Sequence, residues 1–253
     1  MEPYPDVYNP ALLDRIPLDA RLILDVGCNA GALGAEYKRR NPAARYLGIE
    51  KDADCAAVAR SRLDAVAVTD VETNPLPFDL GPFDCIIYGD SLEHMADPWR
   101  LLRHHAAALH ENGTVLICIP NVEHWSLTER LLRGTFDYEP AGLLDHSHLR
   151  WFSWRTTRQA IAEAGLQPHD VMARIFDRDA AERFVATVAP ALRTLGVDTG
   201  EYLGRAAPLQ YVWRARRRVL PQMTIVSSML APVGGVSHVR VIEPLQAMST
   251  DCS

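Results

Sequence analysis

The chain has 253 residues, of which 48% are hydrophobic and 23% charged, with a net charge of -6. This composition is typical of a globular protein with a buried core, and the acidic balance argues against nonspecific nucleic-acid binding, which needs a basic surface. No apolar run approaches the length of a membrane-spanning helix. The five cysteines are scattered and show no metal-ligand spacing, and we expect no disulfide framework. We expect the protein to be cytoplasmic.

A glycine-rich turn follows the first predicted strand. Residues 22–26 form a short apolar run, and the chain then reads Gly27-Cys28-Asn29-Ala30-Gly31 before the apolar positions of a helix. A short apolar run of this kind fits a strand that is buried on both faces of a parallel sheet. The two glycines let a ligand approach the backbone closely, and the next helix offers free N–H groups.

A second predicted strand ends in an acid about twenty residues after this turn. It reads Tyr46-Leu47-Gly48-Ile49-Glu50. A carboxylate at this spacing is placed to accept hydrogen bonds from both hydroxyls of a ribose. A nicotinamide cofactor and S-adenosylmethionine both satisfy the pattern.

The rest of the chain continues the alternation of strands and helices. Apolar runs predict strands at 65–68, 83–88, 114–119, 167–176 and 209–215. Helices are expected over 11–13, 32–40, 52–63, 98–109, 156–164 and 180–195. Asn112-Gly113 predicts a turn into the strand at 114–119. The segment 122–151 breaks the alternation, and we expect it to form the wall that faces a substrate.

Several motifs occur in the order shown by class I S-adenosylmethionine-dependent methyltransferases, which this chain resembles. They are 24–31 with 48–50, then 70–72 with 76–78, then 83–87, and 90–94 with 97–98. Asp25 at the end of the first strand favours this family over dehydrogenases. The resemblance covers about residues 1 to 217. It implies a Rossmann-like, doubly wound α/β fold whose seven-stranded sheet is mostly parallel with an antiparallel last strand.

The resemblance also implies where S-adenosylmethionine would bind. Glu50 would hold the ribose, Asp70 and the N–H of Val71 would hold the adenine, and Asp90 would lie near the methionine part. A turn-forming role for Asp70 stays open. The full predicted set is Asp25, Gly27, Cys28, Asn29, Gly31, Glu50, Lys51, Asp70, Val71 and Asp90.

The candidate general base is a histidine. The stretch 143–153 resembles the part of small-molecule O-methyltransferases in which a histidine precedes an aromatic pair, and His148 is the matching residue. A neutral imidazole suits the removal of a hydroxyl proton, so His148 is the first candidate, followed by His146 and His94. A purely structural role for each histidine is the competing interpretation. Asp145, His146 and His148 could alternatively hold a divalent metal, but without a second acidic cluster we expect no metal site.

Residues 1–218 are therefore predicted to be a methyltransferase domain acting on a small molecule or a sugar or glycan. Residues 219–253 repeat a strand, a glycine turn and a helix, and resemble the start of a glycosyltransferase domain. They form either a linker with the start of a second domain or an edge appendage. The remaining alternatives are a nicotinamide-dependent oxidoreductase and a cofactor-binding domain without turnover. The sequence leaves the oligomeric state open.

Overall fold

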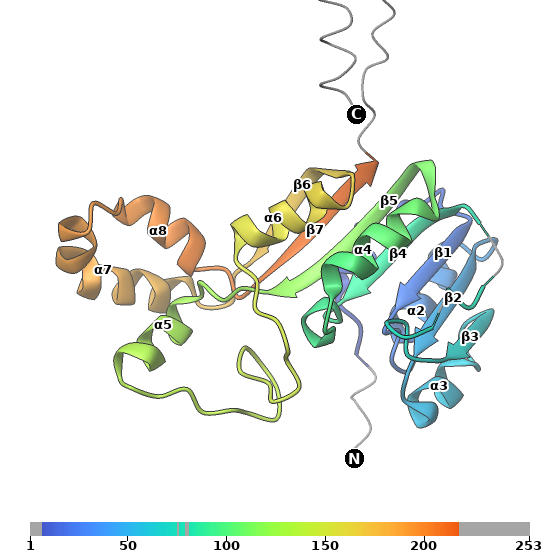
Figure 1. Ribbon diagram of the computed structural model, residues 1–253, viewed down its shortest axis with the longest axis horizontal. Coiled ribbons are helices and arrows are strands. Elements are labelled where there is room, and N and C mark those ends of the chain that lie inside the picture. Colours follow the sequence, from blue (N-terminus) through green and yellow to red (C-terminus); the bar gives the residue numbers. More distant parts are fainter. Residues whose placement is uncertain (1–6, 75, 79–80, 218–253) are drawn as a thin grey trace, which may run out of the picture. The chain divides into compact units, whose positions relative to one another are not determined.

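The computed structural model describes residues 7–74, 76–78 and 81–217, and all structural statements concern these residues (Figure 1). The predicted appendage at 219–253 lies outside them. In the described part of the chain, no helix combines the length and apolar character that a membrane crossing requires.

A seven-stranded sheet organises the fold, in the order β3-β2-β1-β4-β5-β7-β6. Its strands are β1 (Leu22–Val26), β2 (Arg45–Glu50), β3 (Ala65–Val68), β4 (Phe83–Gly89), β5 (Leu109–Pro120), β6 (Leu166–Arg174) and β7 (Gln210–Arg217). Strand β7 runs antiparallel to both β5 and β6, while β1 to β5 pair in parallel. This arrangement confirms the predicted fold class.

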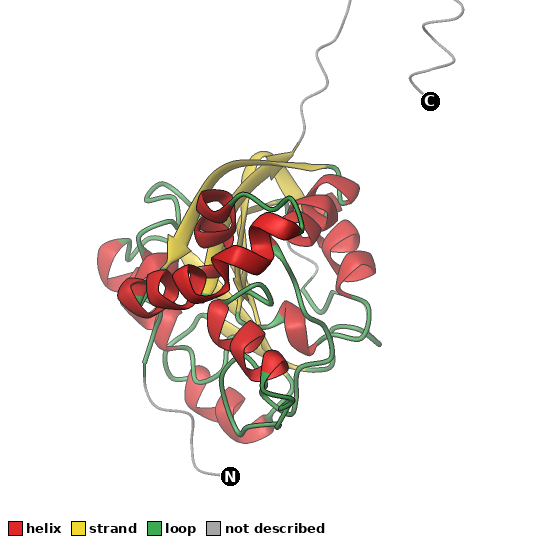
Figure 2. Cartoon of the chain, turned by 90° about the vertical axis from the view of Figure 1, so that its left-hand side faces the viewer, coloured by secondary structure: helices red, strands yellow, loops and turns green. Residues whose placement is uncertain are grey.

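Helices cover both faces of the sheet (Figure 2). They are α1 (Pro10–Leu13), α2 (Ala32–Arg40), α3 (Ala53–Ala59), α4 (Pro98–Ala107), α5 (Trp125–Leu132), α6 (Trp154–Glu163), α7 (Arg178–Thr194) and α8 (Thr199–Ala206), with a 3-10 turn η1 at Leu92–His94. Ile23 packs with α1, α2 and α3, whereas its neighbour Leu24 packs with α4 and α6. Because successive strand residues point to opposite faces, both become buried, which explains the unbroken apolar run of β1.

The crevice for a ligand follows from this topology. Strand β1 lies between β2 and β4, and the helix after β1 covers one face of the sheet while the helix after β4 covers the other. The loops that follow β1 and β4 therefore diverge at the carboxyl edge of the sheet, which is where open α/β folds bind ligands.

One prediction about local structure is wrong, and another is confirmed but incomplete. Asn112 and Gly113 lie inside β5, which begins at Leu109, and the pairing register with β4 shifts between Phe83 and Cys85. A Cβ on Gly113 would lie 2.8 Å from the carbonyl oxygen of Phe83, so glycine allows the close strand contact at this irregularity. The predicted helix at 180–195 is followed by a second one, so α7 and α8 together form the insertion between β6 and β7.

This insertion leaves and re-enters the sheet at neighbouring residues. Arg174 at the end of β6 pairs with Gln210 at the start of β7. The N–H of Leu209 also donates to the carbonyl of Arg174 at 2.9 Å. Helix α7 then contacts both α8 and α5, at the left of Figure 1.

Candidate active site

The glycine-rich loop docks between β2 and the loop after β4. The N–H groups of Gly27 and Cys28 donate to the carbonyl of Ile49 at 2.8 and 3.1 Å. Gly27 has a φ of +79°, and a Cβ placed on it would lie 2.9 Å from Cβ of Ser91. Gly31 also has a positive φ, at +76°, directly before α2. Both glycines thus occupy backbone conformations that other residues adopt only with strain.

Glu50 secures this loop from the end of β2. One carboxylate oxygen accepts a hydrogen bond from the N–H of Asn29 at 2.8 Å, and the other accepts one from the N–H of Asp52 at 2.9 Å. A carboxylate oxygen accepts more than one hydrogen bond, so both retain capacity for ribose hydroxyls. Glu50 therefore has a structural role in addition to the predicted one.

Asp25 and Cys28 direct their side chains into the core. Asp25 is 3% exposed, and its carboxylate accepts a hydrogen bond from the Tyr46 hydroxyl at 2.9 Å. Burial raises the pKa of Asp25 to about 7, against the lowering effect of the Tyr46 hydrogen bond. Cys28 packs on Gly48, where an added Cβ would lie 2.4 Å from its sulfur. A cofactor contact by these side chains remains a prediction. Only the backbone of Cys28 lies in the glycine-rich loop, because its side chain points into the core.

The predicted adenine residues form a turn after β3. Asp70 is exposed, and its carboxylate accepts a hydrogen bond from the N–H of Glu72 at 2.9 Å, while Val71 is buried. Lys51 is exposed. Glu72, which the sequence did not single out, accepts hydrogen bonds from the N–H groups of Ala96 and Asp97, each at 2.8 Å. The turn after β3 is thereby joined to the segment after η1.

Asp90 occupies the end of β4 with a φ of +54°. Its carboxylate accepts a hydrogen bond from the Gln210 amide at 2.6 Å, and burial raises its pKa. Gln210, at the start of the antiparallel strand β7, was not predicted as a site residue. The neighbouring Ser91 hydroxyl is buried and lacks a hydrogen-bond partner within the described residues.

Two of the three predicted histidines come together after β4. The rings of His94, on η1, and His148 lie 4.8 Å apart between centroids in an edge-to-face arrangement. The carbonyl of Glu93 accepts hydrogen bonds from the N–H groups of Leu149 and Arg150 at 2.8 and 3.0 Å, which joins the two segments. His146 lies apart from the pair, because its side chain is 71% exposed and its Nδ1 is 3.3 Å from the Glu139 carbonyl.

The surroundings favour neutral imidazoles. Burial, with a smaller effect of His148, lowers the pKa of His94, and burial also lowers the pKa of His148. Nδ1 of His148 lies 3.3 Å from the Leu143 carbonyl oxygen. Since a carbonyl oxygen only accepts hydrogen bonds, Nδ1 carries the proton and Nε2 retains its lone pair.

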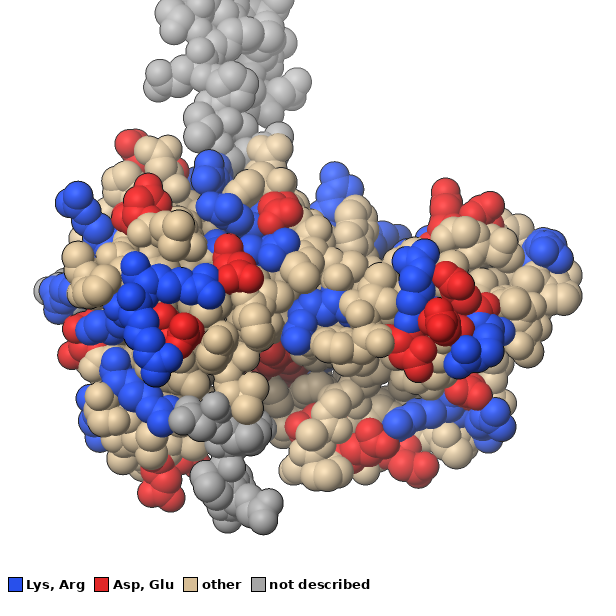
Figure 3. All heavy atoms as spheres, turned by 180° about the vertical axis from the view of Figure 1, so that it is seen from behind, with Lys and Arg blue, Asp and Glu red and all other residues tan. Residues whose placement is uncertain are grey.

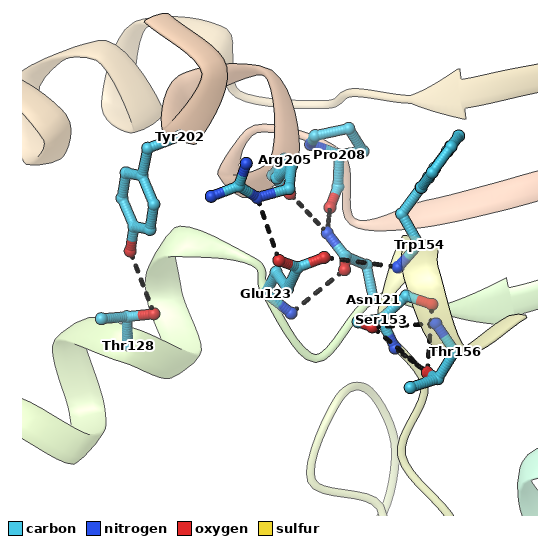
Figure 4. Close-up of polar contacts among 9 residues, drawn as sticks. All are labelled: Asn121, Glu123, Thr128, Ser153, Trp154, Thr156, Tyr202, Arg205 and Pro208. Atoms are coloured by element: carbon cyan, nitrogen blue, oxygen red, sulfur yellow. Dashed lines mark hydrogen bonds and ion pairs between the residues drawn. The ribbon is translucent and has the colours of Figure 1, made fainter. Parts of the chain in front are cut away.

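A polar junction fixes the wall beside this site (Figure 4). Asn121, directly after β5, is buried and donates from its side-chain amide to the carbonyls of Arg205 and Pro208, each at 2.8 Å. Glu123 forms an ion pair with Arg205 at 3.1 Å. These contacts attach α8 to the end of β5. The sequence analysis missed both residues, although the Pro-Asn pair that ends the strand was a signal for Asn121.

A pocket lies next to this junction, between α5 and the loop that precedes His148. Arg130 and Glu139 form an ion pair at 2.7 Å on its wall. Its lining is otherwise mostly apolar and consists of Ser126, Leu127, Arg130, Glu139, Leu143, Leu144 and Leu209.

The comparisons with known proteins agree with this geometry. A model of the methyltransferase domain family matches residues 7–171. The chain belongs to this family. The malonyl-[acyl-carrier protein] O-methyltransferase of Geobacter sulfurreducens is 26% identical over 79% of this chain and 73% of its own length. The ubiquinone biosynthesis O-methyltransferase of Caulobacter vibrioides is 30% identical over 42% of this chain and 44% of its own length.

A solved structure supports the fold. The S-adenosylmethionine-dependent methyltransferase from Thermotoga maritima, described as a possible histamine N-methyltransferase, has a TM-score of 0.56 at 17% identity, covering 83% of this chain and 87% of the other. For two of the curated relatives, the match spans only 34% and 44% of the relative's length. The chain thus contains an S-adenosylmethionine-dependent methyltransferase domain. The family match ends before 219–253, so the glycosyltransferase-like character of that stretch remains a prediction.

Replacement of Gly27 by alanine should abolish binding of S-adenosylhomocysteine. The new Cβ would require an unfavourable positive φ, which costs about 1–2 kcal/mol, and would push against Ser91. Binding is measured by titration calorimetry and folding by thermal denaturation. Gly165→Ala is the matched control, because Gly165 has a φ of +74° but no atom within 4 Å of an added Cβ. Wild-type affinity in Gly27→Ala would show that the glycine-rich loop does not bind the cofactor.

Proposed function

We propose that the chain transfers a methyl group from S-adenosylmethionine to an oxygen atom of a small molecule, with a sugar or glycan among the candidate acceptors. The observation that carries the proposal is the edge-to-face pair of imidazoles of His94, which is half-buried, and His148, which is buried, at the carboxyl edge of the sheet. The O-methyltransferase names of two relatives support the same chemistry.

The residues at this edge fit the cofactor. A Cβ on Gly27 would fill the space between the loop and Ser91, whose buried hydroxyl lacks a partner within the described residues. Gly27, Asn29 and Gly31 would hold the methionine part with Asp90, and Glu50 would hold the ribose. Asp70 and Val71 would hold the adenine. When bound, the cofactor supplies a methyl group on a positively charged sulfur, which is the electrophile of the reaction.

The chain's own residues then orient the acceptor and remove its proton. In-line methyl transfer depends mainly on holding the two reacting atoms at near-attack distance. The pocket between α5 and the loop before His148 offers an apolar lining with one ion pair for the body of the acceptor. Nε2 of His148, with its free lone pair, is the acceptor for the hydroxyl proton. His94 packs against the same ring.

Transfer from isotope-labelled S-adenosylmethionine tests the reaction class. Purified protein is incubated with matched sets of phenols, vicinal diols, sugars and carboxylic acids, and with the corresponding amines. We expect label only in products that are methylated on oxygen. Transfer to the amines alone would refute O-methylation. Binding of S-adenosylhomocysteine without transfer to any acceptor, including ligands that co-purify with the protein, would instead favour a domain without turnover.

Glu50→Ala should weaken binding of S-adenosylhomocysteine by about 1.5–3 kcal/mol, the range for hydrogen bonds to a charged group. This corresponds to a rise in Kd of roughly 10- to 150-fold. Because Glu50 also accepts the N–H of Asn29, thermal denaturation must accompany the titration calorimetry. Glu163→Ala, an exposed change on α6, serves as the control. An unchanged Kd in Glu50→Ala would show that Glu50 does not bind the ribose.

A further inference from the structure

We propose that Glu93, His94 and His148 form a binding site for a divalent transition-metal cation. One ligand atom from each side chain lies within 4.8 Å of the other two. Four-coordinate zinc with ligands at about 2.1 Å holds them about 3.4 Å apart, so the three groups would need to close by up to about 1.4 Å. The chemical role given to the ion below rests on the proposed function, whereas its binding does not.

The strongest evidence is the carboxylate of Glu93. Its side chain is 2% exposed, and neither carboxylate oxygen has a hydrogen-bond partner within the described residues. A buried polar group without partners is costly, and native structures satisfy such a group by hydrogen bonding, by pairing or by metal coordination. A cation in contact with Glu93 would supply the partner that both of its carboxyl oxygens lack.

The two histidines are oriented as metal ligands are. Nδ1 of His148 lies 3.3 Å from the Leu143 carbonyl oxygen, and Nδ1 of His94 lies 3.2 Å from the Ser147 carbonyl oxygen. Nδ1 of His94 also lies 3.1 Å from the Ser147 hydroxyl oxygen, which itself donates to Asp145. Each ring thus donates from Nδ1 and leaves Nε2 unprotonated. A histidine that ligates a metal through one nitrogen usually donates from the other to a carbonyl or a carboxylate, which fixes the ring.

Hydrogen bonds also hold the segments that carry the three ligands. The N–H and hydroxyl groups of Ser147 donate to the Asp145 carboxylate at 2.8 and 2.6 Å. The Glu93 carbonyl accepts the N–H groups of Leu149 and Arg150, so ligands from two distant segments are held together before any ion binds. The alternative set of Asp145, His146 and His148 is not brought together, because His146 points to solvent.

Two imidazoles and one carboxylate favour zinc, manganese, iron(II) or cobalt over magnesium, which prefers oxygen ligands. Three protein ligands leave coordination positions for an oxygen of the acceptor, whose pKa the ion would lower. The ion would lower the pKa of the bound hydroxyl so that its proton passes to water, and His148 would act as a ligand instead of the proton acceptor of the proposed function. This departs from the expectation that the site holds no metal.

The test is metal binding by chelator-treated protein without cofactor or acceptor. Calorimetric titration with Zn²⁺ and with Mn²⁺ should show one site, and Co²⁺ should produce a visible absorption spectrum. Glu93→Gln and His148→Ala should each weaken Zn²⁺ binding by at least about 100-fold, since even residues behind metal ligands cost 10- to 100-fold. His146→Ala and His104→Ala, at exposed positions, should leave the affinity unchanged. His148→Ala keeps the test valid if Glu93→Gln does not fold.

The outcomes separate this site from the proposed function. Absence of binding by all three metals, or binding that neither Glu93→Gln nor His148→Ala weakens, overturns the metal site. Loss of Zn²⁺ binding in His146→Ala would assign the ion to the alternative set and likewise overturn it. Metal binding with methylation of amines alone would support the site and refute the proposed function. Methylation of hydroxyls by protein that binds no metal would support the proposed function and refute the metal site.

Discussion

His148→Ala should lower the rate of methyl transfer to a hydroxyl acceptor by about 10²- to 10⁴-fold, the usual contribution of a general base. The Kd for S-adenosylhomocysteine should hardly change, because the predicted cofactor residues lie on other loops. His148 is 8% exposed and packs edge-to-face on His94, so the variant removes a side chain directed into the site rather than a surface group. Single-turnover rates with saturating cofactor measure the effect on the chemical step.

The matched control for this variant is His104→Ala. His104 is exposed in the last turn of α4, where the chain approaches the start of β5 and not the carboxyl edge of the sheet. Its replacement should leave the rate at the wild-type value. If His148→Ala also retained the wild-type rate, its ring would be a packing residue and the proton would leave by another route.

Asp25→Asn should remove a large pH dependence from the stability of the fold. Burial raises the pKa of Asp25 to about 7 in the folded protein, from 3.8 in the unfolded chain. Between these values the folded state binds more protons than the unfolded state, so stability falls as the pH rises from about 4 to about 7. The full shift corresponds to a loss on the order of 4 kcal/mol in the free energy of unfolding. The Asp25→Asn variant would show no such loss, because an asparagine side chain does not titrate.

Chemical denaturation at a series of pH values between 4.5 and 8 measures this effect. The stability of Asp25→Asn relative to wild type should increase with pH and level off above the pKa of Asp25. The variant retains an oxygen that accepts the Tyr46 hydroxyl. Asp19→Asn, at an exposed position, is the control. Parallel stability curves for wild type and Asp25→Asn would show that Asp25 is ionised in the folded protein at low pH.

The strands and the main loops were predictable because their signals are local. The apolar runs of β1 and β2, the glycines after β1 and the acid at Glu50 each follow from a few neighbouring residues. Alternation also places Asp25 on the face of the sheet that Ile23 occupies, because Asp25 lies two residues after Ile23. Asn112-Gly113 misled the prediction because its position against β4, and not its turn propensity, determines the backbone there.

The site above the sheet was harder to predict because long-range contacts assemble it. The segment around Asp145 has no periodicity that shows which of His146 and His148 turns inward. The answer depends on two backbone hydrogen bonds to Glu93, a residue the sequence analysis did not treat as a site residue. Gln210 and Glu123 likewise acquire their roles from contacts between separate elements.

The pairing of Arg174 with Gln210 has a consequence for how such proteins diverge. A segment whose two ends are hydrogen-bonded neighbours can change greatly in length at little entropic cost, because closing a longer loop adds only about 0.6 kcal/mol per doubling. Helices α7 and α8 occupy this position, away from the glycine turn after β1. Related proteins can therefore differ in this insertion while the cofactor loops stay unchanged.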